Sequence, residues 1–73
     1  MRMIEITRTD DASVADQLTE MKEWLRERGI QPFQLEPIQI EDAEVRFRAI
    51  FAISEDAERF CRRFDEANAR ALA

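Results

Sequence analysis

The chain has 73 residues, of which 45% are hydrophobic and 37% are charged, and its formal net charge is −5. This length supports one compact core but not two, so we expect a single domain, residues 1–73. The acidic balance repels phosphate backbones and anionic membrane surfaces, and we therefore expect neither nucleic acid nor a membrane as a partner. No apolar run approaches a membrane span, and charge interrupts the N-terminal segment too early for a signal peptide, so a cytoplasmic protein is expected.

Histidine is absent from the sequence and cysteine occurs once. A chain without histidine lacks the commonest general base and metal ligand, and no nucleophile–histidine pair can form within it. A single cysteine allows neither an intramolecular disulfide nor the usual zinc clusters. We therefore expect a non-enzymatic protein that holds no metal and no cofactor.

The first predicted element is a strand, because Ile4 and Ile6 fall on one side of the alternating segment 1–8. A helix should follow, with Gly29 suited to its left-handed end. N-cap chemistry is available just before this helix from Thr9, Asp10 and Asp11. Its apolar face consists of Val14, Leu18, Met21 and Leu25.

Two alternating segments, 33–36 and 38–41, run in opposite phase and predict one strand with a bulge at Glu36-Pro37. Since proline cannot donate to a strand ladder, this second strand is expected at a sheet edge. The inward residues of a third strand are Val45, Phe47, Ala49, Phe51 and Ile53. A turn around Asp42-Ala43 would place opposite one another the pairs Ile40–Val45, Ile38–Phe47, Leu35–Ala49 and Phe33–Phe51.

Ser54 is expected to cap a second helix, which has an apolar stripe flanked by glutamate–arginine pairs. The stripe consists of Ala57, Phe60, Cys61, Phe64, Ala67 and Ala71. The pairs are Glu55–Arg59, Glu58–Arg62 and Glu66–Arg70. The order β-α-β-β-α, with a right-handed crossover, predicts an α+β two-layer sandwich: a three-stranded sheet in the order 1-3-2 with both helices on one face. This topology resembles a ferredoxin-like fold lacking its last strand, a resemblance that implies no function.

Side chains that could carry chemistry each have a structural explanation. Cys61 lies within the apolar stripe of the second helix, where apolar surroundings keep a thiol inert. Ser13 and Ser54 lie near helix starts, where serine caps or occupies the first turn. The acidic turn 41–44 lacks the glycine and the spaced oxygen ligands of a calcium loop. Catalysis by carboxylates and arginines alone would require a concave pocket with a perturbed Glu or Asp.

Arg46 and Arg48 project from the third strand away from the predicted core and suggest a patch for phosphate or nucleic acid. Arg2 or Arg8 could add to this patch. Carboxylates of the neighbouring strands should share this side of the sheet and compensate its charge; they are Glu5 and Glu36 or Glu41.

Two surfaces could support association: the uncovered sheet face and the unprotected edge of the first strand. Met3, Ile50 and Ala52 add apolar area to the face, and Trp24, at the margin of the first helix, could anchor an interface. The leading hypothesis is a module that binds itself, as a homodimer through either surface, or another protein. The alternative is a small-ligand-binding or regulatory domain, with an unidentified ligand, in which Glu5, Arg46 and Arg48 line a dimer groove on the open face.

Overall fold

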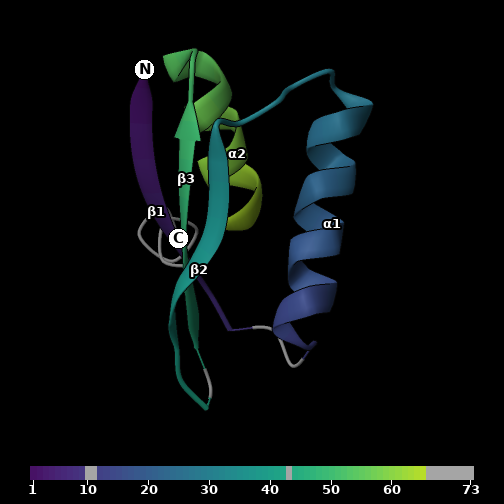
Figure 1. Ribbon diagram of the computed structural model, residues 1–73, viewed down its shortest axis with the longest axis vertical. Coiled ribbons are helices and arrows are strands. Elements are labelled where there is room, and N and C mark those ends of the chain that lie inside the picture. The colour runs from purple at the N-terminus through teal and green to yellow at the C-terminus, as the bar shows by residue number, and fades with distance from the viewer. Residues whose placement is uncertain (10–11, 43, 66–73) are drawn as a thin grey trace.

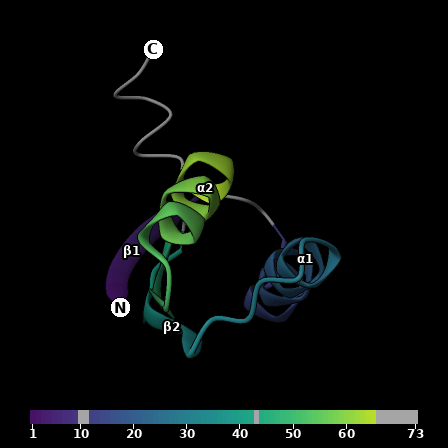
Figure 2. The same ribbon diagram turned by 90° about the horizontal axis from the view of Figure 1, so that it is seen from above.

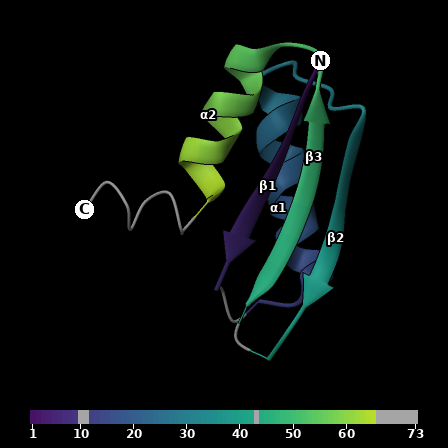
Figure 3. The ribbon, with the colours of Figure 1, turned by 90° about the vertical axis from the view of Figure 1, so that its left-hand side faces the viewer.

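The computed structural model describes residues 1–9, 12–42 and 44–65 (Figure 1). Its elements are β1 (Arg2–Arg8), α1 (Val14–Glu27), β2 (Gln34–Ile40), β3 (Val45–Phe51) and α2 (Ser54–Phe64). The sheet has the strand order β1-β3-β2, and both outer strands are antiparallel to β3. Both helices lie on one face of the sheet (Figure 2, Figure 3). The predicted α+β sandwich, with its ferredoxin-like arrangement, is confirmed. Within the described ranges, no helix is long and apolar enough to cross a membrane.

Helix α1 begins directly after Ser13, which is its N-cap. The Ser13 hydroxyl oxygen accepts a hydrogen bond from the Asp16 N–H at 3.1 Å, as N-cap serines do in the first helical turn. The prediction that Thr9 caps this helix is wrong, because Ser13 occupies the N-cap position. Asp10 and Asp11, the other expected caps, lie outside the described residues.

The end of α1 has the hydrogen bonds of a Schellman motif. Gly29 has a φ of 69°, the left-handed region that glycine occupies without a Cβ clash. Its N–H donates to the Arg26 carbonyl at 3.1 Å, and the Ile30 N–H donates to the Leu25 carbonyl at 2.9 Å. The predicted glycine ending is therefore confirmed, and it turns the chain back toward β2.

The bulge in β2 lies one residue later than predicted. Pro37 lies opposite Phe47 and Gln39 lies opposite Arg46, so Ile38 is the extra residue. The predicted pairing of Ile38 with Phe47 is therefore wrong. Proline can remain in register on an edge strand when its missing N–H would have pointed to the free edge. The other two predicted pairs that fall within β2 are confirmed: Ile40–Val45 and Leu35–Ala49.

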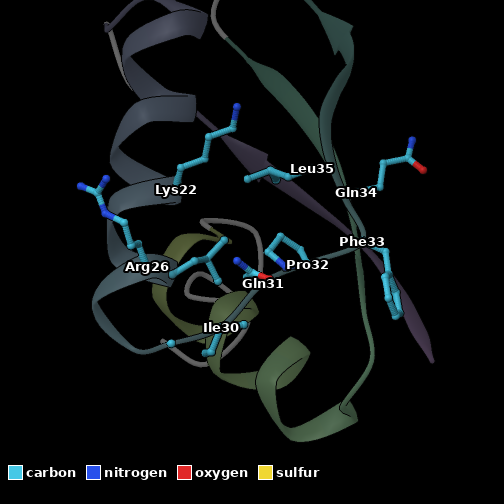
Figure 4. A pocket seen from close by; sticks show the side chains of 10 residues that line it. Lys22, Arg26, Ile30, Gln31, Pro32, Phe33, Gln34 and Leu35 are labelled. Carbon is cyan, nitrogen blue, oxygen red and sulfur yellow. The ribbon is translucent and has the colours of Figure 1, made fainter.

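Phe33 and Ile53, both predicted to point into the core, are 68% and 57% exposed. The Phe33 N–H donates to the Ile50 carbonyl at 2.7 Å, so the residue lies outside the regular ladder and does not pair with Phe51. Figure 4 shows its ring on the side of β2 away from Leu35. Ile53 follows the end of β3 and is the N-cap of α2, so strand alternation no longer sets its direction.

The core lies between the sheet and the two helices and is joined by an aromatic cluster. Phe60 is fully buried, and its ring centroid lies 5.3 Å from Phe51 and 5.0 Å from Phe64. Trp24 of α1 meets the Phe60 and Phe64 rings edge-on, at centroid distances of 6.1 and 5.5 Å. Such edge-to-face contacts add to the apolar burial of each ring. The cluster therefore ties α1 and α2 to the central strand.

Helix α2 starts differently from the prediction. Ser54 is its first residue and not its cap, and the Ser54 hydroxyl accepts a hydrogen bond from an Arg2 guanidinium N–H at 2.8 Å. Glu58 also pairs with Arg2, at 3.2 Å, and not with Arg62 as predicted. The sequence spacing could not anticipate this, because Arg2 comes from the adjacent strand. The Glu55–Arg59 pair is confirmed at 2.9 Å. The predicted residues Ala67 and Ala71 and the pair Glu66–Arg70 lie outside the described residues.

Candidate functional site

The sheet face that no helix covers carries Arg46 and Arg48, as predicted. Successive side chains of a strand point to opposite faces, so the register assigns three cross-strand rows to this open face. From β1 through β3 to β2, the rows are Met3–Ile50–Gln34, Glu5–Arg48–Glu36 and Thr7–Arg46–Gln39. The face therefore carries an apolar end, a charged middle row and a polar row around Arg46. At one end, Met3 is 56% exposed and lies beside the half-buried Ile50.

On the open face, the charge of Arg48 is matched by carboxylates of the neighbouring strands. The Arg48 guanidinium lies 3.1 Å from a Glu5 carboxylate oxygen, and Glu36 lies opposite Arg48 on the other side. The Gln34 amide also donates a hydrogen bond to Glu36. A half-exposed ion pair of this kind contributes little to stability, typically below about 1 kcal/mol. The expected charge compensation is present at Arg48, whereas Arg46 forms no ion pair among the described residues.

Arg2 and Arg8 do not extend this patch, because they share the helix-facing side of β1 with Ile4 and Ile6. Arg8 is only 7% exposed. Its guanidinium lies 3.0 Å from a Glu20 carboxylate oxygen of α1 and 5.2 Å from the Phe64 ring centroid. The idea that these two arginines join Arg46 and Arg48 is wrong. The alternation of β1 already indicates this placement, since it assigns all four even-numbered residues of the strand to one face.

Trp24 is half-buried and contributes to packing at the core margin. One part of its ring meets the α2 phenylalanines, and the Arg28 guanidinium lies 4.2 Å from the ring centroid. A stacked guanidinium shields an indole and contributes a cation–π attraction. These contacts give Trp24 a packing role within a single chain. Its proposed part in an interface stays a prediction.

Cys61 is half-buried on α2, and its Sγ–H donates to an Asp65 carboxylate oxygen at 3.5 Å. Burial raises the pKa of the Cys61 thiol, and the negative charge and hydrogen bond of Asp65 raise it further, against a smaller lowering by Arg2. A raised pKa leaves less thiolate at neutral pH, and the thiolate is the reactive form. The structure thus supports the expectation of an unreactive thiol.

Thiol alkylation tests this environment. We expect native Cys61 to react with iodoacetamide more slowly at about pH 8 than in the urea-unfolded chain, where the thiol has an ordinary pKa of about 8.5. Asp65→Asn removes the negative charge and should speed the reaction of the folded protein. It also keeps an oxygen that can accept the Thr7 N–H. Equal native rates for the two proteins across the alkaline range would contradict the role given to Asp65.

The free edge of β1 exposes backbone groups that can pair with another strand. The Thr7 N–H donates to an Asp65 carboxylate oxygen at 3.1 Å, so it points away from β3. Backbone groups two residues apart in an antiparallel strand point the same way. The N–H and C=O groups of Met3 and Glu5 therefore face this edge. Asp65 covers one end of the edge, and within the described part of the chain no second strand pairs with the segment around Ile4.

A shallow hollow of about 190 Å³ follows this edge between β1 and α2. Ile4, Ala57 and Cys61 supply its apolar lining. Its charged lining has both signs and consists of Arg2, Glu58 and Arg62. An exposed strand edge next to such a hollow can accept both backbone and side-chain contacts from a partner.

The edge of β2 is less suited to pairing. On β3, Arg48 lies opposite Glu5, so its backbone groups point toward β2, where Glu36 is its partner. Pro37, the next residue, therefore faces the free edge, and it has no N–H to donate. The extra residue Ile38 then interrupts the strand. Proline and bulges are devices that protect sheet edges from association.

Among residues 1–9, 12–42 and 44–65, no group of three or more Cys, Asp or Glu side chains is placed to hold a metal ion. In comparisons with protein-family models, with curated proteins and with solved structures, nothing matched the chain. The surfaces of the chain are therefore the features from which a function can be inferred.

Proposed function

We propose that this protein is a non-enzymatic interaction module that forms a homodimer, edge to edge through β1. The observation that carries the proposal is the exposed β1 edge, where the backbone groups of Met3 and Glu5 face outward beside the apolar hollow at Ile4. A domain of 73 residues buries little apolar surface by itself, which makes association favourable. We also propose the cytoplasm as its compartment, because a lone free thiol persists where thiols are kept reduced.

One register of the paired strands fits a two-fold axis. If two copies of β1 run antiparallel and the axis passes at Ile4, then Met3 pairs with the partner's Glu5, and their N–H and C=O groups bond in both directions. Ile4 then meets the partner's Ile4 over the two hollows. A register centred on Glu5 would place two carboxylates opposite each other, which is destabilising. The charge pattern therefore favours the Ile4 register.

Met3→Pro is the variant that tests this edge. Proline removes an outward N–H, and the hydrogen bonds from β1 to β3 stay intact because Met3 does not donate to β3. We expect the dimer dissociation constant to rise at least about tenfold, because symmetry removes the bond twice and each is worth about 1 kcal/mol. Met3→Val, which keeps the N–H and an apolar side chain, should dimerise like the wild type. Sedimentation velocity measures both, with circular dichroism to verify folding.

Ile50→Lys distinguishes a dimer formed through the β1 edge from one formed through the open sheet face. Ile50 lies on the open face of β3, away from the free edge of β1. A dimer joined through the β1 edge should tolerate this charge. Loss of the dimer in Ile50→Lys, together with a normal dimer in Met3→Pro, would move the interface to the open face and overturn the edge proposal.

A further inference from the structure

A large hollow lies between α1 and β2. It has a volume of about 700 Å³, within the range of small-ligand sites. Its apolar lining comes from α1, from the connection after Gly29 and from the start of β2, and it includes Leu25, Ile30, Pro32 and Leu35 (Figure 4). Leu25 and Ile30 are buried, and Pro32 and Leu35 are half-buried, so apolar surface remains accessible inside it.

The fold explains why this hollow is open. Helix α2 covers β1 and β3, and α1 stands toward the outer side of β2 (Figure 2). Gly29 turns the chain sharply at the end of α1, and the connection then crosses to β2 along the base of the gap (Figure 4). Phe33 also lines the hollow at its β2 side, and Figure 4 shows its ring directed away from Leu35.

The lining of the hollow is basic in an acidic protein. It includes Lys22 and Arg26 but no aspartate or glutamate, although the chain has a net charge of −5. Figure 4 shows the Lys22 side chain extending toward the β2 side of α1, and the Arg26 guanidinium on the other side of the helix. Among the residues that the structure describes, Lys22 forms no ion pair. An apolar base beside one free ammonium group matches a molecule that has an apolar body and an anionic end.

We infer that this hollow binds a small amphipathic carboxylate, whose apolar body lies on Leu25, Ile30 and Leu35 and whose carboxylate pairs with Lys22. A peptide strand fits less well, because β2 offers a poor ladder at this edge: Pro37 has no N–H and Ile38 is bulged out. The site is separate from the proposed dimer contact, since β1 and β2 are opposite edges of the sheet.

Octanoate is a suitable probe, and amide NMR of this 8.6 kDa chain can map where it binds. We expect saturable shifts at the lining residues, such as Leu25, Ile30 and Leu35, and little change at Met3 or on β1. Octylammonium has the same chain with the opposite charge and should bind at least about tenfold more weakly, since a charge-assisted hydrogen bond is replaced by repulsion. Equal responses to the two probes would overturn the inference.

Charge reversal at Lys22 tests the anion contact. Lys22→Glu should weaken octanoate binding at least about tenfold. The matched control is Arg46→Glu, which makes the same change in net charge on the open sheet face and should bind octanoate like the wild type. Equal losses in the two variants would mean that net charge and not the Lys22 contact governs binding. Met3→Pro should bind octanoate normally, so failure of the dimer and failure of this site are distinguishable.

Discussion

Replacing Phe60 with alanine is expected to lower the free energy of unfolding by about 3–5 kcal/mol, the usual result for a buried phenylalanine. Phe60 is fully buried and contacts rings from β3, from α1 and from its own helix. Its loss would leave a cavity at the point where these elements meet. A chain of this length typically has a total stability of roughly 5–10 kcal/mol, so a large part of it would be lost.

Urea unfolding followed by circular dichroism measures this change. Phe33→Ala is the matched control, because it deletes the same atoms from a side chain that is 68% exposed. We expect it to change stability by less than about 0.5 kcal/mol. Similar losses in the two variants, at one protein concentration, would contradict the inward and outward assignments of these rings.

Replacing Arg8 with alanine is expected to lower stability by about 2–3 kcal/mol, far more than an exposed arginine would. The side chain is 8% exposed, packs its guanidinium over Phe64 and pairs with Glu20. Truncation removes the packing of a long stem as well as the charge contacts. Arg46→Ala, on the exposed side of the sheet, should change stability by less than about 0.5 kcal/mol.

Arg8→Met distinguishes the contribution of side-chain packing to stability from the contribution of the charge. Methionine fills much of the same volume, and an apolar replacement of a buried ion is often neutral because it avoids the desolvation of the charge. We expect Arg8→Met to lie within about 1 kcal/mol of the wild type. A loss as large as that of Arg8→Ala would show that the guanidinium itself, and not the buried stem, stabilises this position.

Much of the fold could be predicted because strand alternation and glycine chemistry are local signals. The alternation of Val45, Phe47 and Ala49 predicts the third strand, Pro37 predicts that the second strand is an edge strand, and Gly29 predicts the end of α1. The predictions were wrong where contacts with residues distant in the sequence determine the local structure. The first residue of α2 hydrogen-bonds to Arg2, and the backbone of the residue before β2 bonds to Ile50.

Some of the candidate surfaces could likewise be predicted from local sequence patterns, and others could not. The exposed β1 edge and the open-face pair of Glu5 and Arg48 followed from alternation and strand order alone. The hollow beside Lys22 could not be predicted, because it depends on how far α1 stands from β2. The alternation pattern of β1 does predict the burial of Arg8, because it places this residue on the helix-facing side with Ile6.

The solution mass of the wild-type protein, measured by light scattering during size-exclusion chromatography over a range of concentrations, tests the proposed homodimer most directly. We predict a mass that approaches twice 8.6 kDa as concentration rises and that falls on dilution. The proposed contact through the β1 edge would be mainly backbone pairing, so moderate salt should change this mass little. A mass of 8.6 kDa at every concentration would contradict the homodimer.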